Sequence, residues 1–284
     1  MTNYAYRKFK NKLFFALSLG CVIIAAVPLL SILTEVILKG APQLSIKFLT
    51  QHAGVIGSSD AGGIGPAIQG TLILIGLTCL ISMPLGVMSG IFLAEHGNSK
   101  YASAYAAWMR IFNNALTGVP SIVVGITVFA AVVLTLGHYS PLAGAIALSF
   151  IAIPIVARTT EESLKLVPNS VREASLALGV RNWRTTVSVV LPDARKGLVT
   201  GALLAMARIA GETAPLLMTI LGGQYFFQGF SQPMDALPLR IYRDAFLPYS
   251  NFQTQAWGGA LVLILIVLTL NIGVRVASRG RLGK

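Results

Sequence analysis

The chain has 284 residues and a net charge of +12 at pH 7, yet only 11% of its residues are charged and 55% are hydrophobic. This composition excludes an ordinary soluble domain and is typical of a membrane protein. The excess of Lys and Arg does not indicate nucleic-acid binding, because these residues gather between long apolar segments. We expect them to report membrane topology and contact with anionic lipids.

Six apolar segments are each long enough to cross about 30 Å of hydrocarbon. We therefore predict an all-α membrane protein with one transmembrane domain over residues 1–284. The predicted spans are residues 13–38, 70–93, 117–136, 141–157, 198–221 and 257–277. In the second span, Gly86 and Gly90 predict close packing against another helix. At the start of the third span, Pro120 after Gly118 predicts a break in the helix.

The distribution of basic residues predicts the orientation of the chain. Seven of the 22 Lys and Arg lie in the central polar segment, residues 158–197, and others flank both chain ends. Only Lys39, Lys47, Arg240 and Arg243 fall on the opposite side of the predicted membrane. Since positive charge is retained in the cytoplasm, both termini and the central segment are expected to be cytoplasmic.

The sequence lacks the usual marks of an enzyme or a cofactor protein. It contains no Gly-x-x-x-x-Gly-Lys loop, so this chain is not expected to bind ATP itself. His52, His96 and His138 are scattered and predict no metal site, and Cys21 and Cys79 fall inside spans, where they are expected to pack as small apolar residues. We expect no cofactor, metal or catalytic residue, so any energy source must be a partner or an ion gradient.

The central segment, residues 158–197, has the pattern of a folded element. Ser170 and Glu173 fit a capping box at the start of a short helix, and Gly179 is expected to end it. Asn182 is expected to cap a further helix. Two short helices at an angle on the cytoplasmic face would form a docking surface.

Glu173-Ala174-Ser175, followed by Gly179 and then by Leu191-Pro192, resembles the coupling loop of ABC-importer permeases. In that family the pattern is Glu-Ala-Ala, then Gly, then a Leu-Pro-like end, so Ser175 stands in place of the second Ala. The resemblance implies that Glu173, Ala174, Gly179, Leu191 and Pro192 couple the chain to an ATP-hydrolysing subunit. The alternative is a helical hairpin on the membrane surface without a partner.

The fifth predicted span carries two charges near its centre. Arg208 lies roughly 15 Å from Leu198 at ~1.5 Å per residue, close to the bilayer midplane, where an Arg costs at least ~2.5–3.5 kcal/mol. Glu212 is four residues further on, which places both side chains on one face of a helix. A self-neutralising pair is one interpretation, but such pairs contribute only a few tenths of a kcal/mol. A water-filled path for a transported anion accounts better for Arg208.

The sequence Arg208-x-x-Gly211-Glu212-Thr213-Ala214-Pro215 resembles the permeases of phosphate-specific ABC importers. The segment from Ala236 to Tyr242 looks like the A-type of their two permease subunits. The resemblance implies an inner-membrane assembly with a second permease of the PstC type, two ATPases of the PstB type and a phosphate-binding protein of the PstS type. It also implies that Arg158, Glu161, Arg208 and Glu212 lie on the translocation path.

The function predicted from the sequence is therefore the inward transport of inorganic phosphate, driven by a separate ATPase. One alternative is an importer of another oxyanion, such as sulfate or molybdate. Another is a secondary transporter or channel with Arg208 and Glu212 as an ion-coupled gate, although such a carrier needs no coupling element. An intramembrane enzyme is a third alternative, but the sequence contains no convincing set of catalytic residues for it.

Overall fold

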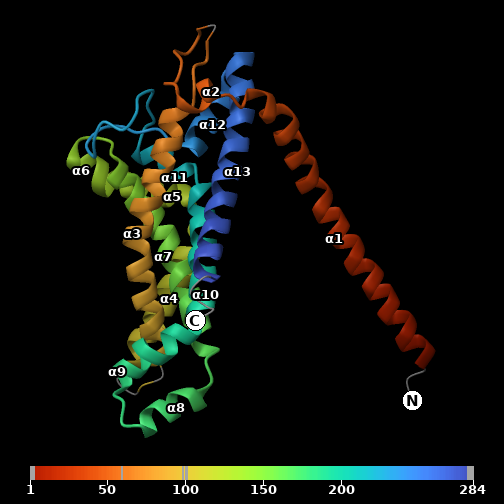
Figure 1. Ribbon diagram of the computed structural model, residues 1–284, viewed down its shortest axis with the longest axis vertical. Coiled ribbons are helices and arrows are strands. Elements are labelled where there is room, and N and C mark those ends of the chain that lie inside the picture. Colours follow the sequence, from red (N-terminus) through yellow and green to blue (C-terminus); the bar gives the residue numbers. More distant parts are fainter. Residues whose placement is uncertain (1–3, 59, 98, 100–101, 280–284) are drawn as a thin grey trace.

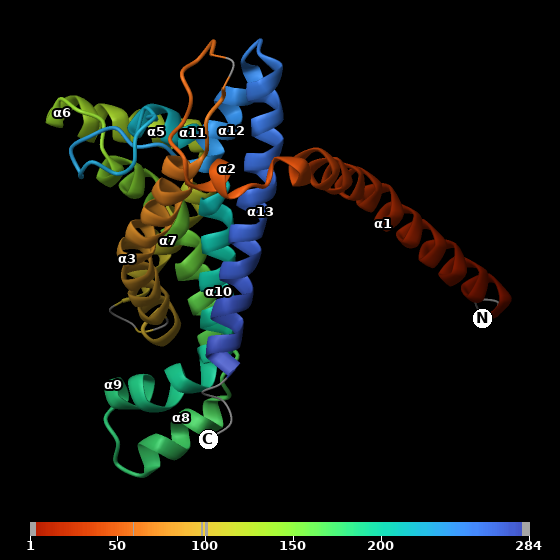
Figure 2. The same ribbon diagram turned by 45° about the horizontal axis from the view of Figure 1, so that its top comes forward.

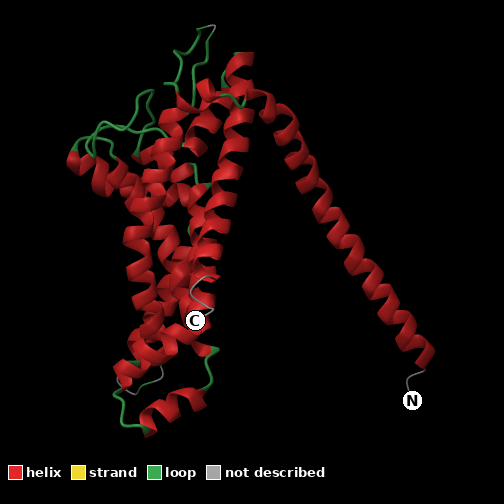
Figure 3. Cartoon of the chain, in the orientation of Figure 1, coloured by secondary structure: helices red, strands yellow, loops and turns green. Residues whose placement is uncertain are grey.

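The computed structural model describes residues 4–279 except 59, 98, 100 and 101, and within these ranges the chain is helical with two isolated β-bridges (Figure 3). The α-helices are α1 (Tyr4–Gly40), α2 (Ile46–Thr50), α3 (Gly65–Glu95), α4 (Ser103–Gly118), α5 (Ser121–Val128), α6 (Leu134–Leu136), α7 (Pro141–Lys165), α8 (Asn169–Ala177), α9 (Asn182–Thr185), α10 (Leu191–Ala210), α11 (Ala214–Thr219), α12 (Leu237–Phe246) and α13 (Ser250–Arg279). A 3-10 turn, η1 (Ala41–Gln43), and two π-helical turns, η2 (Phe129–Val133) and η3 (Thr186–Val190), join some of them.

Helices α3, α4, α7, α10 and α13 run lengthwise in one bundle, and α1 leaves the bundle at one end (Figure 1). The predicted close packing of α3 is confirmed. A Cβ atom on Gly86 would lie 2.6 Å from Val156 Cβ, and one on Gly90 would lie 2.5 Å from Thr160 Cβ, both on α7. Glycine is therefore required at both positions for the two helices to approach this closely.

Four helices are long and apolar enough to cross a membrane by themselves: α1, α3, α7 and α13. They coincide with the first, second, fourth and sixth predicted spans, although α7 continues to Lys165, beyond the predicted end of its span at residue 157. The polar residues after 157 were assigned to a loop by composition, but a helix can continue past the hydrocarbon. Arg158 and Glu161 therefore lie inside α7 and not at the start of a loop.

The third predicted span, residues 117–136, begins at a break between two helices and is not one straight helix. Helices α4 and α5 are bent by 103° at a break, so that α4 rises along the bundle and α5 with α6 crosses its end (Figures 1 and 2). The break lies where the sequence predicted one. Val119 is extended before Pro120, because proline disfavours helical geometry in the residue that precedes it.

The fifth predicted span, residues 198–221, is also not a single helix. Helix α10 ends at Ala210, residues 211–213 are not helical, and α11 follows. Helix α10 carries Asp193, Arg195, Lys196 and Arg208, which makes it less apolar than the other long helices. Within the described ranges, four helices qualify as spans, or five if the bent pair is counted as one, so the predicted count of six is not reached by length and composition.

The segments that the sequence predicted to share a side of the membrane do lie at the same end of the bundle. The start of α1, the end of α13 and helices α8 and α9 lie toward one end, and the connections before α3 and after α11 lie at the other (Figures 1 and 2). Residues 1–3 and 280–284, the predicted cytoplasmic termini, lie outside the described residues. Helix α12 folds back onto the bundle and buries Leu237 and Leu239.

Candidate translocation path and docking surface

Glu161 of α7 is held by two cations in a nearly buried position. Its side chain is 12% exposed, and its Oε1 atom lies 3.0 Å from Arg110 Nη2 of α4 and 2.6 Å from Lys165 Nζ. Arg110 Nη2 also donates to the carbonyl of Leu93 near the end of α3 at 3.1 Å. This set joins three helices, so Glu161 serves first as a structural connection between α3, α4 and α7.

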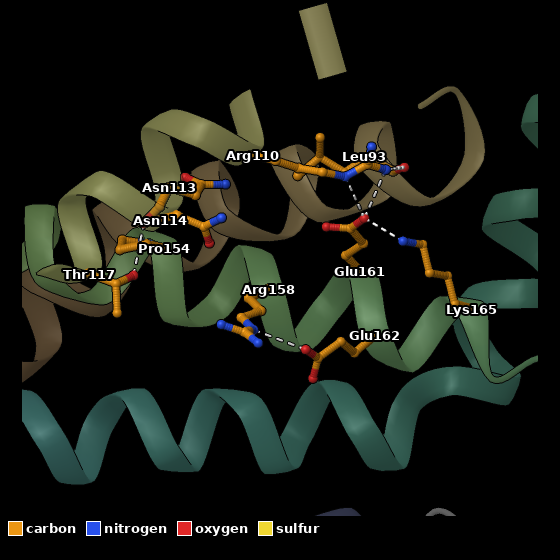
Figure 4. Close-up of a pocket in the computed structure, with 10 residues that line it drawn as sticks. All are labelled: Leu93, Arg110, Asn113, Asn114, Thr117, Pro154, Arg158, Glu161, Glu162 and Lys165. Carbon is orange, nitrogen blue, oxygen red and sulfur yellow. Dashed lines mark hydrogen bonds and ion pairs between the residues drawn. The ribbon is translucent and has the colours of Figure 1, made fainter. Parts of the chain in front are cut away.

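Arg158 does not pair with Glu161. Its Nε atom lies 3.0 Å from Glu162 Oε1, and the two side chains are 68% and 63% exposed. Both residues line a cavity of about 250 Å³ between α4 and α7 (Figure 4). The other lining residues are Leu93, Arg110, Asn113, Asn114, Thr117, Pro154, Glu161 and Lys165. The structure thus brings Arg158 and Glu161 to one cavity but gives them different partners.

Sequence reasoning missed Arg110, Glu162 and the two asparagines of this cavity. Arg110 contacts a residue 51 positions away, and nothing in the local pattern predicts that pairing. Asn113 and Asn114 did carry a signal, since two successive amides interrupt an apolar stretch of α4.

Arg208 and Glu212 form an ion pair across the end of α10. Arg208 lies in the last turn, Glu212 lies in the non-helical break, and the Arg208 Nη2 and Glu212 Oε1 atoms are 3.3 Å apart. Arg208 is 58% exposed and Glu212 is 14% exposed. The expected geometry of two residues on one continuous helix is wrong, but the predicted contact between the two side chains is confirmed.

The depth of Arg208 follows from the packing of α10 against α7. Cβ atoms built on Gly197 and Gly201 would meet Ser163 and Thr159, so the two helices run antiparallel. That register places Arg208 level with the middle of α7, and about 9 Å along the axis from Arg158 at ~1.5 Å per residue. Arg158 and Arg208 therefore occupy separate positions along the bundle.

The two broken helical segments contact each other where α5 meets the start of α11. A Cβ atom on Gly125 of α5 would lie 2.8 Å from the Cα atom of Pro215, at the start of α11. Breaks in membrane helices are tolerated where the freed backbone groups face protein or a water-filled cavity. The break at Glu212 therefore fits a position on a polar path.

Helices α8 and α9 form a hairpin that projects from the end of the bundle (Figure 2). Gly179 ends α8 with φ of +79°, its amide donates to Leu176, and the amide of Val180 donates to Ser175. These two bonds form a Schellman motif, which requires the left-handed conformation that glycine adopts without strain. The prediction that Gly179 ends the helix is confirmed.

Three details predicted for this hairpin are wrong. Pro168 caps α8, so Ser170 lies inside the helix and its predicted capping bond to Glu173 is not formed. Arg181 occupies the cap of α9, one residue before Asn182. Leu191 and Pro192 do not end a loop but begin α10, because the chain stays helical through η3.

The exposed face of the hairpin combines the family-type residues with large apolar side chains. Glu173, Ala174 and Gly179 are exposed, and Leu178 and Trp183 are 84% and 64% exposed. Exposed apolar side chains of this size at the tip of a projecting element mark an interaction surface. The hairpin is held to the bundle by Arg172, which donates to Glu95 of α3 and to the carbonyls of Leu164 and Val167.

Comparison with known proteins agrees with this architecture. The sequence profile of the family described as "Binding-protein-dependent transport system inner membrane component" matches residues 82–280. A Haemophilus influenzae protein described as "Phosphate transport system permease protein PstA" is 42% identical over 96% of this chain and 95% of its own length. A Yersinia pestis protein of the same description is 41% identical over 96% of this chain and 91% of its own length.

The solved structure of a bacterial alginate ABC transporter, in complex with an alginate pentasaccharide-bound periplasmic protein, contains a chain of the same fold. Its TM-score is 0.69 over 99% of this chain and 98% of that chain, at 13% identity. At this identity the likeness supports the fold alone.

Proposed function

This chain belongs to the family of binding-protein-dependent transport system inner membrane components, and we propose that it carries inorganic phosphate inward as the permease subunit of an ATP-driven importer. The assignment of phosphate as the substrate rests on the sequence identity of 42% with a phosphate transport permease over nearly the whole of both chains. Both relatives compared above are described as phosphate permeases, and neither is described as a carrier of sulfate or molybdate.

The energy for this transport comes from a separate ATPase that docks on the α8–α9 hairpin. The hairpin projects beyond the bundle, exposes apolar side chains, and is fastened to α3 and α7 through Arg172. Such an element is expected of a subunit that receives force from a partner, and a secondary carrier has no use for it. By the resemblance described above, the partner is an ATPase dimer of the PstB type, and no cofactor binds to this chain.

The path through the membrane is formed together with a second permease of the PstC type. Arg208 is more than half exposed on this single chain, at the middle depth of the bundle. An Arg at that depth needs a polar surrounding. A path between two permease subunits provides it, and phosphate offers the guanidinium two oxygen atoms at once.

The bundle end that carries α12 and the connections around it faces outward, toward a phosphate-binding protein of the PstS type. The end that carries α8, α9, the start of α1 and the end of α13 faces the cytoplasm. The charge asymmetry of the sequence supports this orientation, and so does the grouping of the corresponding segments at opposite ends of the fold.

Uptake of radiolabelled phosphate tests the proposal, in cells that lack other phosphate carriers. We expect uptake to require this chain and the ATPase, and to persist when ion gradients are collapsed but ATP is maintained. A Gly179→Pro chain, which cannot form the left-handed turn, should insert into the membrane and fail to transport. Cells that take up sulfate or molybdate but not phosphate would overturn the assignment of the substrate. Phosphate uptake in cells without the ATPase would overturn the proposed energy source.

A further inference from the structure

The cavity between α4 and α7 contains polar groups that have no structural partner. Asn113 and Asn114 lie on one wall and Arg158 and Glu162 lie on the other (Figure 4). No hydrogen bond joins either asparagine side-chain amide to another described residue, whereas the hydroxyl of Thr117 donates to the carbonyl of Asn113 at 2.8 Å. Two adjacent amides on an otherwise apolar helix segment are thus available to a ligand.

The ion pair on the other wall is also available. Arg158 and Glu162 are both more than 60% exposed, and exposed pairs of this kind contribute about 0–1 kcal/mol, so an anion displaces them easily. Glu161 is different, since Arg110 and Lys165 hold its carboxylate in place. In this cavity the Glu161 carboxylate is therefore held in place, whereas the Arg158 guanidinium and the Glu162 carboxylate are free to rearrange around an anion.

This combination of groups matches phosphate better than sulfate. At neutral pH phosphate carries at least one hydroxyl, which donates a hydrogen bond, while sulfate carries none. Guanidinium and amide groups donate to the oxygens of either anion. A carboxylate accepts a bond from phosphate but repels sulfate, and such a repulsive element is an effective source of specificity.

We propose that the cavity between α4 and α7 is a phosphate-selective transit site, in which Arg158, Asn113 and Asn114 donate to the anion and Glu162 accepts from its hydroxyl. This inference rests on the proposed phosphate transport and adds a selection step inside the permease. The volume of about 250 Å³ leaves room for a partly hydrated tetrahedral anion. The site is distinct from Arg208, which lies deeper in the bundle.

The test uses the complete permease–ATPase complex in lipid nanodiscs, without the extracytoplasmic binding protein, so that the selectivity measured belongs to the membrane subunits. Equilibrium dialysis with radiolabelled inorganic phosphate measures binding, and unlabelled arsenate or sulfate serves as competitor. In the wild type, arsenate, which carries the same hydroxyl, should displace phosphate, and sulfate should not.

Glu162→Gln replaces the acceptor by a group that also donates. Sulfate should then compete roughly tenfold better, as expected for one hydrogen bond to a charged group. The double variant Asn113→Ala with Asn114→Ala should bind phosphate roughly tenfold more weakly and still reject sulfate. Glu35→Gln makes the same charge change in α1, at an exposed position beyond the cavity, and should behave as the wild type.

Two results would overturn the transit site. One is unchanged sulfate competition in Glu162→Gln. The other is phosphate binding by the double asparagine variant that equals that of the wild type, and a wild type that binds no phosphate counts as this result. Both are separate from failure of the proposed function, which would appear as absence of phosphate uptake by the wild-type complex with its binding protein.

Discussion

The hydroxyl of Ser175 in α8 lies 2.9 Å from the hydroxyl of Thr185 in α9, and both side chains are buried. Ser175 stands where the family pattern has alanine, so the extra hydroxyl has a partner on the facing helix. The bond joins the two arms of the docking hairpin across the turn at Gly179. The serine at position 175 is therefore not a neutral replacement of alanine, because its hydroxyl is paired with that of Thr185.

We predict that Ser175→Ala alone reduces phosphate uptake several-fold, because it leaves the buried Thr185 hydroxyl unsatisfied at a cost of about 1–3 kcal/mol to the hairpin. Thr185→Val alone should do the same. The double variant should recover much of the loss, since both partners are then apolar. Uptake normalised to membrane levels completes the double-mutant cycle, and strictly additive effects would show that the two hydroxyls act independently.

A second prediction concerns the attachment of the hairpin to the bundle. Arg172→Ala removes the contact with Glu95 and the bonds to the carbonyls of Leu164 and Val167. We expect the ATPase still to co-purify but to hydrolyse more ATP for each phosphate transported in proteoliposomes. Arg7→Ala, a change at an exposed Arg of α1 outside the docking hairpin, is the matched control. An unchanged ratio of ATP to phosphate in Arg172→Ala would show that force passes by another route.

Local signals predicted the local features of this fold. Apolar length gave α1, α3, α7 and α13, and Pro120 and Gly179 marked a break and a helix end because each restricts or extends the backbone directly. The break after Ala210 was missed although Gly211 was noted, since a glycine alone is compatible with a continuing helix. Tertiary packing decides such cases.

The candidate site divides in the same way. The contact of Arg208 with Glu212 was predictable because the two residues are four positions apart. The clamp of Arg110 on Glu161 was not, since it depends on how α4 crosses α7. Composition also placed Arg158 outside a helix, because a charged segment at the membrane surface looks the same in sequence whether it is helix or loop.

A third prediction concerns pH. Asp244 of α12 lies outside the predicted spans, and its burial, which outweighs the effect of Arg240, raises its carboxyl pKa to about 6 from 3.8. The folded state therefore binds a proton that the unfolded state releases at pH values between about 4 and 6. The stability contributed by this group is fully present below about pH 4 and is lost as the pH rises through about 6.

Asp244→Asn should flatten this part of the profile, because an amide does not titrate. The measurement is the Tm of the purified complex between pH 4 and 7, compared with the wild type. Asp193→Asn, at an exposed position of α10, serves as control and should keep the wild-type slope. A slope in Asp244→Asn equal to that of the wild type would assign the pH dependence to other groups.

The fourth prediction concerns Arg208 and Glu212. Arg208 offers phosphate a cation near the middle of the bundle, and Glu212, which lies 3.3 Å from it, limits how tightly the anion is held. Arg208→Gln should reduce phosphate uptake to background without preventing assembly, because a neutral amide does not compensate the anion for its lost hydration. Arg208→Lys keeps the charge but loses the two-pronged donor, so uptake should be partial.

Glu212→Gln tests the second half of the same relationship. Removal of the carboxylate leaves Arg208 uncompensated, so phosphate should be held longer and the maximal uptake rate should fall, while half-saturation occurs at lower phosphate. Uptake of radiolabelled phosphate over a range of concentrations separates these two effects, with chain levels measured by immunoblot. Glu173→Gln, a change in the docking hairpin far from the path, should lower the rate without changing half-saturation. Wild-type uptake by a well-expressed Arg208→Gln chain would reduce the pair to a packing contact at the end of α10.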